Sequence, residues 1–144
     1  MPTIRQYRPE DRQGVIEVWK NAGLIRPQND PSRDIDRKLA YDPEGFLVAE
    51  EQGKVIGVVM AGYEGHRGWL QYLGVDPAHQ GNRIGRQLVE AAVELLRQRG
   101  APKVNLQIRT TNAKVIAFYE HLGFRLDEVA SMGLRLVEDE ISTQ

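Results

Sequence analysis

A glycine-containing turn between a strand and a helix constrains this sequence more than any other feature. The stretch from Leu73 to Val89 reads LGVDPAHQGNRIGRQLV: a strand ends at Val75, and QGNRIG at 80–85 opens directly into an amphipathic helix. Such a junction presents unpaired backbone N–H groups and the positive end of a helix dipole, which together bind phosphate oxygens. The segment therefore predicts a loop that holds a phosphate-bearing ligand at a helix start.

Hydrophobic patterning predicts alternating strands and helices along the chain. Apolar periodicity and turn residues place strands at 3–8, 46–50, 55–63, 69–75, 104–108 and 124–136, and helices at 11–22, 32–41, 83–99 and 112–122. The order is β α α β β β α β α β. Short turns between the second, third and fourth strands imply antiparallel neighbours. We expect one α/β domain over residues 1–144, with a mixed, mostly antiparallel central sheet flanked by helices.

The composition excludes several classes of protein. The 144 residues contain no cysteine and three scattered histidines, so neither disulfides nor a metal site is predicted. The formal net charge is -1 and neither half of the chain is strongly basic, which argues against nucleic-acid binding. No apolar signal segment opens the chain, and its longest weakly polar run, 55–63, is about half of what spans a bilayer. We expect a soluble, cytoplasmic protein with no membrane or nucleic-acid partner.

Two common phosphate loops do not match QGNRIG. A P-loop requires Lys followed by Ser or Thr after its last glycine, whereas Gly85 precedes Arg86 and Gln87. A dinucleotide fingerprint requires three spaced glycines, and only Gly81 and Gly85 are present. Arg83 and Arg86 can add ionic contacts to phosphates. The alternative is an ordinary glycine-containing turn before an amphipathic helix.

The string QGNRIG resembles the pyrophosphate loop of the GCN5-related N-acetyltransferases (GNAT superfamily), which reads Gln or Arg, two variable residues, Gly, one variable residue, then Gly or Ala. Arg83 stands where that family usually has its central glycine. A second segment, NAKVIAFYEHLGF at 112–124, resembles the family's later helix. The element order is similar over nearly the whole chain. The resemblance, to the short single-domain bacterial type, implies acetyl transfer from acetyl-CoA to a primary amine by direct attack in a ternary complex.

The resemblance also implies where acetyl-CoA binds. In that fold the fourth and fifth strands splay apart, the pantetheine chain pairs with the freed edge of the fourth, and loop amides hold the pyrophosphate. The expected cofactor-binding residues are Leu73, Gly74, Val75, Gln80, Gly81, Asn82, Arg83, Ile84, Gly85, Arg86, Asn112 and Tyr119. For Asn112 the alternative is a plain helix N-cap. No metal is expected.

Tyr119 is the expected catalytic residue, because a Tyr at this position in related enzymes acts as general acid toward departing coenzyme A. Its alternative is a core aromatic. The general base is less defined, since Gln107 stands where ribosomal-protein N-terminal acetyltransferases have Glu. We expect Glu64 to act through water, with His66 as a second candidate and with Tyr72 and Gln71 positioning the water; the alternative for Glu64 and His66 is a solvated turn.

The acceptor is expected to be a small-molecule or peptide amine. Loop 24–32, which should cross the splay, carries Arg26, Asn29 and Asp30 as expected substrate residues; an ordinary solvated loop is the alternative. Asp30 suits a cationic acceptor and Arg26 a carboxylate. The closing run 138–140, of Glu, Asp and Glu, is predicted to be a solubilising tail. The oligomeric state is left open, with a homodimer as one alternative.

Two rival functions remain. The first is a coenzyme A binding or sensing module without catalysis, favoured by Gln107, by Arg83 and by the lack of a carboxylate on strand 69–75. Tyr119 argues against it. The second is a phosphate-binding interaction module unrelated to coenzyme A, which requires both resemblances to be coincidental.

Overall fold

Five strands in chain order, β1-β2-β3-β4-β5, form one sheet in the computed structural model, which describes residues 2–139. The strands are β1 (Thr3–Gln6), β2 (Phe46–Glu51), β3 (Lys54–Tyr63), β4 (Gly68–Val75) and β5 (Val104–Asn105). The helices are α1 (Arg12–Asn21), α2 (Pro31–Tyr41), α3 (Ile84–Gln98) and α4 (Ala113–His121), with 3-10 turns at Pro9–Asp11, Pro43–Gly45 and Pro77–His79. The predicted fold class is confirmed, and so is the predicted element order as far as α4.

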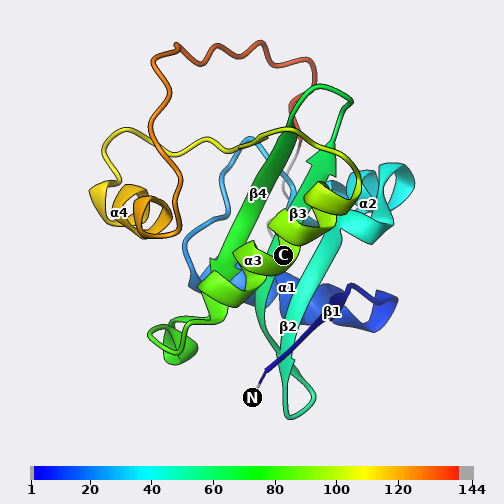
Figure 1. The fold of residues 1–144 in the computed structure, drawn as a ribbon. Coiled ribbons are helices and arrows are strands. Elements are labelled where there is room, and N and C mark those ends of the chain that lie inside the picture. Colours follow the sequence, from blue (N-terminus) through cyan, green and yellow to red (C-terminus); the bar gives the residue numbers. More distant parts are fainter. Residues whose placement is uncertain (1, 140–144) are drawn as a thin grey trace.

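The pairing directions follow from the lengths of the connections. β1, β2, β3 and β4 pair antiparallel in succession, whereas β5 lies parallel to β4. Parallel neighbours need a long crossover, and α3 supplies it. Figure 1 shows α3 running across one face of the sheet in front of β3.

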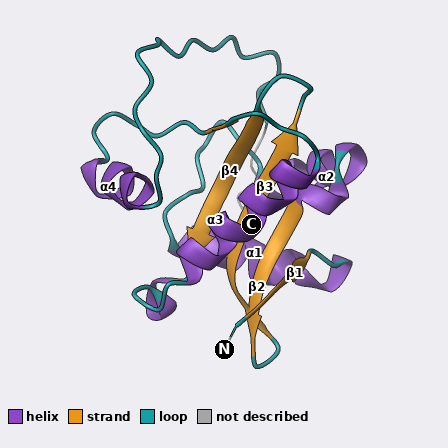
Figure 2. Cartoon of the chain, in the orientation of Figure 1, coloured by secondary structure: helices purple, strands orange, loops and turns teal. Residues whose placement is uncertain are grey.

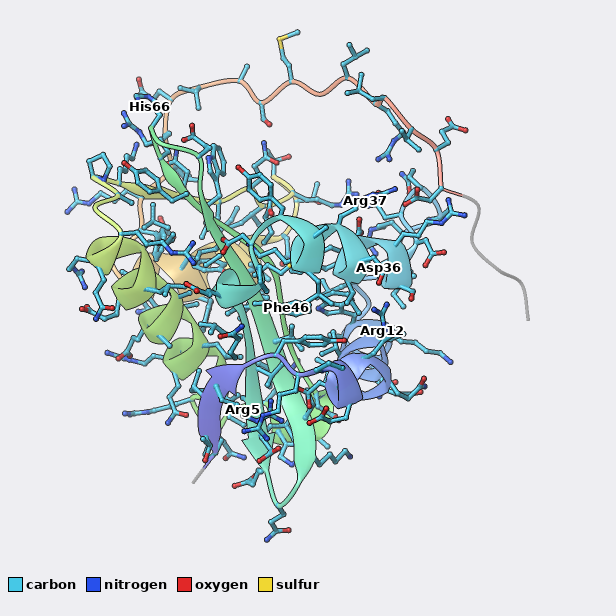
Figure 3. The ribbon with its side chains drawn as sticks, turned by 90° about the vertical axis from the view of Figure 1, so that its right-hand side faces the viewer. Arg5, Arg12, Asp36, Arg37, Phe46 and His66 are labelled. Carbon is cyan, nitrogen blue, oxygen red and sulfur yellow. The ribbon has the colours of Figure 1, made fainter. Side chains whose placement is uncertain are left out.

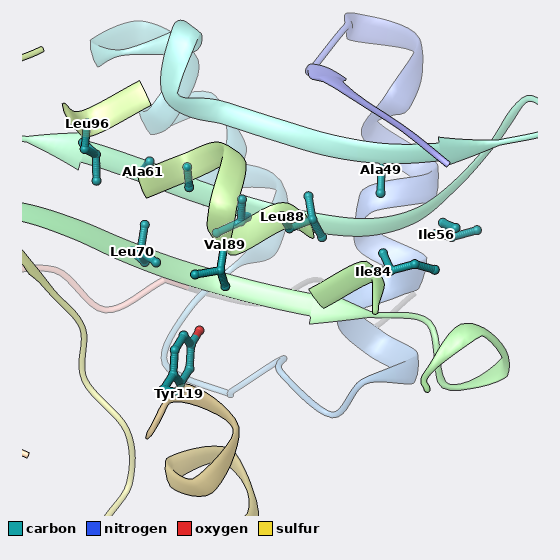
Figure 4. Packing of buried hydrophobic residues seen from close by; sticks show 11 residues of the cluster. Ala49, Ile56, Ala61, Leu70, Ile84, Leu88, Val89, Leu96 and Tyr119 are labelled. Carbon is teal, nitrogen blue, oxygen red and sulfur yellow. The ribbon is translucent and has the colours of Figure 1, made fainter. Parts of the chain in front are cut away.

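Helices cover both faces of the sheet. α1 and α2 pack on one face around Trp19 and Phe46, while α3 and α4 lie on the other (Figures 1 and 2). β3 is buried from Val55 to Ala61, as expected for a strand covered on both sides. Figure 4 shows Leu88 of α3 and Tyr119 of α4 among the side chains of the second face. The two faces thus form separate apolar clusters.

The sequence specifies α3 more fully than any other helix. Apolar side chains recur at helical spacing and are buried at Ile84, Leu88, Val89, Ala92 and Leu96. Arg97 in the last turn suits the negative end of the helix dipole. This packing fixes α3 across the sheet and brings its N-terminus to the end of β4.

The strand predicted at 124–136 is wrong, because residues 125–139 form no strand. An extended segment becomes a strand only when its backbone groups pair with a neighbour. Here the segment meets β5 and its surroundings through side chains, such as Lys103 Nζ with Asp127 at 3.0 Å. Its large apolar side chains stay exposed at Leu126, Val129, Met132, Leu134, Leu136 and Val137.

Within residues 2–139, no helix is long and apolar enough to cross a membrane. The same residues bring together no group of three His, Asp or Glu side chains that could hold a metal ion.

Candidate active site

β4 and β5 separate after two paired positions. Gly68 pairs with Val104 and Trp69 with Asn105, and the ladder ends there. The chain after β5 then turns away toward α4, as Figure 1 shows. Along Leu70–Val75, the edge of β4 that faces β5 therefore has no strand partner in the described chain. The splay implied by the resemblance is confirmed, and it explains why the predicted fifth strand ends early.

A β-bulge interrupts β4 within this separated stretch. The register against β3 shifts between Gln71 and Gly74, so that Tyr72 and Leu73 share one partner position. Tyr72 has φ 58°, a left-handed conformation that is uncommon for residues other than glycine. Its carbonyl accepts a hydrogen bond from Trp19 Nε1 at 3.1 Å. The bulge is therefore held from the α1 side of the sheet.

Gly74 has a packing role in this structure. A Cβ at this position would lie 3.0 Å from Leu24 Cδ1 and 3.4 Å from Trp19 Cδ1. Glycine thus allows α1 and the following loop to approach β4 closely. Leu73 and Val75, the other two predicted residues of this strand, flank Gly74 at the separated edge.

The loop between β4 and α3 carries a run of free amides. Asp76 accepts from the amide of Ala78 at 3.0 Å, and Gln80 Nε2 donates to the carbonyl of Val75 at 3.3 Å. No amide from Gly81 to Arg86 donates a hydrogen bond within the described chain, and no side chain caps the start of α3. Unpaired amides and the helix dipole meet at one point there. The structure places all six loop residues predicted from Gly81 to Arg86 at this point.

Arg83 keeps the backbone shape that a glycine would give. Its φ is 61°, in the region that glycine enters freely and that costs other residues roughly 1–2 kcal/mol. The departure from the family pattern therefore leaves the loop conformation intact. The side chains of Arg83 and Asn82 are exposed and have no partner in residues 2–139. Arg86 instead pairs with Glu90 at 2.7 Å.

α4 is positioned against the same loop. A Cβ on Gly85 would lie 3.3 Å from Phe118 Cζ, so glycine allows α4 to approach α3. Asn112 caps α4, with its Oδ1 accepting from the amide of Val115 at 3.2 Å. The predicted cap is confirmed, and the side-chain amide N–H groups of Asn112 stay available for a ligand.

Tyr119 is a core aromatic whose hydroxyl stays open to a partner. Only 7% of the residue is exposed, and its ring meets Phe118 and Phe124 edge-on at 5.0 and 5.3 Å between centroids. Figure 4 shows the hydroxyl pointing from α4 toward β4, and it makes no hydrogen bond to residues 2–139. Burial raises the pKa of Tyr119 above its usual value, so the hydroxyl is a proton donor at neutral pH.

A hollow of about 1490 Å³ lies beside Tyr119. Its walls come from α3, from β5 and the residues after it, from α4 and from residues 123–132. Both Val89 of α3 and Trp69 of β4 contribute to the lining. The volume is within reach of an elongated ligand, and the hollow borders Arg86 at the start of α3, although none of Leu70–Val75 lines it.

Glu64 and His66 lie together in the β3–β4 turn, away from this arrangement. The Glu64 carboxylate accepts from the amides of His66, at 3.1 Å, and Arg67. Figure 3 shows His66 at the tip of the hairpin. From Gly68 to Tyr72 the strand rises roughly 13 Å, which separates Glu64 from the bulge. The carboxylate is therefore a turn cap in this structure.

The predicted acceptor residues lie together in the loop before α2, where each has a hydrogen-bond partner. Arg26 donates to a loop carbonyl at 2.7 Å. Asn29 Oδ1 accepts from Arg135 at 3.3 Å. Asp30 caps α2 by accepting from first-turn amides at 2.9 and 3.4 Å. These contacts shape the loop, and its member Leu24 reaches the site by packing on Gly74.

Sequence reasoning missed Asp139, which is buried and not part of a solvated tail. Arg37 binds both of its carboxylate oxygens, at 2.6 and 3.0 Å, and the amide of Asp30 donates to it at 3.1 Å. Arg37 projects from α2 beside the C-terminal segment (Figure 3). The predicted solubilising role is therefore wrong for Asp139; Glu140 lies outside the described residues. No local pattern links positions this far apart.

The Arg37 contact should make stability depend on acid pH. Arg37, with the amide of Asp30, lowers the pKa of Asp139 to about 2. An ionised Asp139 therefore stabilises the fold above about pH 4, and this contribution is lost as the pH falls toward 2. We expect Asp139→Asn to lower the Tm at pH 6, with the difference from wild type shrinking in acid. A difference that stays constant between pH 6 and pH 2 would contradict the ion pair.

The family assignment rests on both sequence and fold. The Acetyltransferase (GNAT) family profile matches residues 13–124, which is most of the chain. This chain therefore belongs to the GNAT acetyltransferase family.

Individual proteins agree with the assignment. The chain is 46% identical to an acetyltransferase of Sodalis glossinidius over 138 residues, covering 95% of this chain and 97% of that protein. Ard1 from Thermoplasma volcanium has a similar fold, with a TM-score of 0.79, 24% identity and coverage of 88% of this chain and 84% of that one. AAC(6')-Iy, solved with the bisubstrate analogue CoA-S-monomethyl-acetylneamine, gives a TM-score of 0.77 at 18% identity, covering 95% and 99%.

Proposed function

We propose that this GNAT protein transfers an acetyl group from acetyl-CoA to a primary amine, supplied by a small molecule or a peptide. The observation that carries the proposal is the run of free amides from Gly81 to Arg86 at the end of a strand whose outer edge is also unpaired. A diphosphate and an extended amide-bearing chain, joined in one ligand, would satisfy both sets of groups. Coenzyme A has this construction, and a fold neighbour was solved with a coenzyme A conjugate.

Named groups would hold the donor. The amides of Gly81–Arg86 would receive the pyrophosphate, and the exposed Arg83 guanidinium would add charge. The free edge at Leu73–Val75 would pair with the pantetheine amides. Gln80 would keep the loop folded on β4, and the amide of Asn112 would contact the donor from α4.

Tyr119 would interact with the sulfur of the departing coenzyme A. Its hydroxyl points to β4 and has no partner in residues 2–139. Complete proton transfer from a phenol to a thiolate is uphill by roughly 2 kcal/mol in water, and the raised pKa of Tyr119 makes it more so. A hydrogen bond that strengthens as negative charge develops on sulfur is therefore the role that fits Tyr119.

The reaction would proceed by direct attack in a ternary complex. The chain has no cysteine to form an acyl-thioester intermediate. Acceptor and donor would meet at the separated stretch of β4, where the outer edge of the strand has no partner in the described chain. The acceptor would approach past the loop that contains Arg26, Asn29 and Asp30.

A panel assay tests the proposal. The protein is incubated with acetyl-CoA and amines of several classes (amino acids, polyamines, aminoglycosides and peptides), and released thiol is followed. Thiol release that depends on an amine supports acetyl transfer. Calorimetric binding of acetyl-CoA without release for any amine would instead favour the coenzyme A binding or sensing module, and absence of binding would contradict both.

Asn82 offers a clean test of the donor loop. Its side chain is exposed and unpaired in the described chain, so Asn82→Asp adds a charge without disturbing packing. A carboxylate beside a diphosphate should weaken acetyl-CoA binding about tenfold at low salt. Asn82→Ala is the matched control and should stay within about twofold of wild type. If calorimetry gives equal acetyl-CoA affinities for the two variants, the diphosphate does not bind at this loop.

A further inference from the structure

Tyr72 and Asp34 form a hydrogen-bonded pair on the opposite face of the sheet from Tyr119. The Tyr72 hydroxyl donates to Asp34 Oδ2 at 2.5 Å, joining the β4 bulge to α2. Its ring stacks on Trp19, 4.1 Å between centroids, and belongs to the α1–α2 cluster. Tyr119 belongs to the α3–α4 cluster. The separated stretch of β4 therefore has one tyrosine on each side.

We propose that Tyr72 accepts the proton which the acceptor nitrogen loses during attack, while its own hydroxyl proton moves to Asp34. This inference rests on the proposed function and supplies a general base on a strand that carries no carboxylate. Tyr72 is the group that would meet the amine, and Asp34 acts behind it. Leu24 and Ile25 belong to the same cluster as Tyr72, so the loop before α2 borders the bulge on this face, the side from which the amine would approach.

Neighbouring residues hold Tyr72 and Asp34 in an arrangement that suits this proton transfer. Arg37 Nη1 donates to Asp34 Oδ1 at 3.0 Å and leaves Oδ2 to Tyr72. Arg37 is itself held by Asp139, so the Asp34 carboxylate is held in place beside this guanidinium. Burial, the Asp34 hydrogen bond, and the charges of Asp34 and Asp139 raise the pKa of Tyr72, while Arg37 opposes the shift. The hydroxyl consequently stays protonated, donates to Asp34, and has lone pairs left for an incoming N–H.

The atoms balance as follows. The lone pair of a neutral amine forms the C–N bond to the thioester carbonyl carbon, and the nitrogen becomes acidic as it does so. That proton passes to Tyr72 Oη as the hydroxyl proton of Tyr72 moves to Asp34 Oδ2. The C–S bond then breaks with its electron pair on sulfur; the thiolate accepts a hydrogen bond from Tyr119 and takes its proton from solvent. Asp34 finally releases its proton to solvent, leaving the amide and free thiol.

The test uses Asp34→Asn and Tyr72→Phe with an amine found in the panel. Both should lower kcat about a hundredfold for a basic alkyl amine, with KM for the amine and affinity for acetyl-CoA nearly unchanged. For a weakly basic acceptor the deficit should shrink below about tenfold, because its nitrogen loses the proton to water more readily. Tyr72→Phe keeps the ring stacked on Trp19 and so guards against a folding defect.

Asp36→Asn is the matched control, since Asp36 is another carboxylate on α2 but pairs with Arg12 at 2.6 Å. It should keep wild-type kcat. Asp34→Asn could lower the Tm while kcat stays intact, or kcat could fall equally for basic and weakly basic amines. Either result would show that the pair is purely structural, and would overturn this inference while leaving the proposed function standing. A wild-type protein that binds acetyl-CoA but acetylates no amine would overturn the proposed function and this inference together.

Discussion

Replacing Tyr119 by phenylalanine is expected to lower turnover about a hundredfold while acetyl-CoA affinity stays nearly intact. A hydrogen bond to sulfur grows stronger as negative charge develops, so its loss falls on kcat more than on binding. General acid assistance is typically worth about 10² to 10⁴-fold, and we place Tyr119 at the low end because its raised pKa opposes full proton transfer. Released thiol at saturating acetyl-CoA is the measurement.

Phenylalanine is the right replacement because it preserves the ring. The edge contacts with Phe118 and Phe124 remain, and the lost hydroxyl has no partner in residues 2–139. The free energy of unfolding should therefore change by less than a typical hydrogen bond contributes, which is about 1 kcal/mol. If Tyr119→Phe keeps more than about half of wild-type turnover, with chemistry shown to limit the rate, Tyr119 is only a core residue.

Trp19→Ala is expected to cost about 3–5 kcal/mol of unfolding free energy. Trp19 is fully buried between Phe46 and Tyr72, with ring centroids 6.4 and 4.1 Å away. Removing the indole leaves a large cavity and also leaves the carbonyl of Tyr72 without its donor. Urea denaturation should show a lower midpoint with an unchanged slope.

Trp19→Phe separates the two contributions. It keeps an aromatic ring beside Tyr72 but removes the Nε1 hydrogen bond, so we expect a smaller loss of about 1–2 kcal/mol. If Trp19→Ala costs less than about 1 kcal/mol, the indole does not hold the bulge. Either variant should leave binding at the Gly81–Arg86 loop intact in the molecules that remain folded.

Local signals in the sequence were sufficient for the donor side of the site. The strand-to-helix junction and the apolar stripe of α3 both arise from residues within one or two turns of each other. The Asn112 cap of α4 is equally local. Such features depend on backbone geometry and helical periodicity, which a sequence displays directly.

The acceptor side depends on contacts between distant residues. Tyr72 meets Asp34 across 38 positions, and Arg37 meets Asp139 across 102. The sequence around these residues does not predict the pairs, because they form only where the packing of the helices against the rest of the fold brings distant residues together. The prediction of a strand at 124–136 was wrong for a related reason. Its alternating apolar pattern is typical of a strand, but a strand also needs a neighbouring strand to pair with, and the pattern does not identify one.

Arg83 shows a third kind of case. The sequence displays a departure from a glycine pattern, and only the backbone angle of 61° shows that the loop keeps its shape. Arg83 adopts this left-handed backbone at a conformational cost, although glycine would adopt it freely. An exposed guanidinium at this position supports a role for its charge at the phosphates. The departure is therefore compatible with donor binding.

Amide chemical shifts measured during an acetyl-CoA titration test the central claim most directly. The account predicts the largest changes at Gly81–Arg86, whose amides are free to bind a diphosphate, and at Leu73–Val75, whose outer edge has no strand partner in the described chain. Smaller changes should reach Tyr119 and its neighbours on α4. Shifts confined to other parts of the molecule, or none at saturating acetyl-CoA, would contradict it.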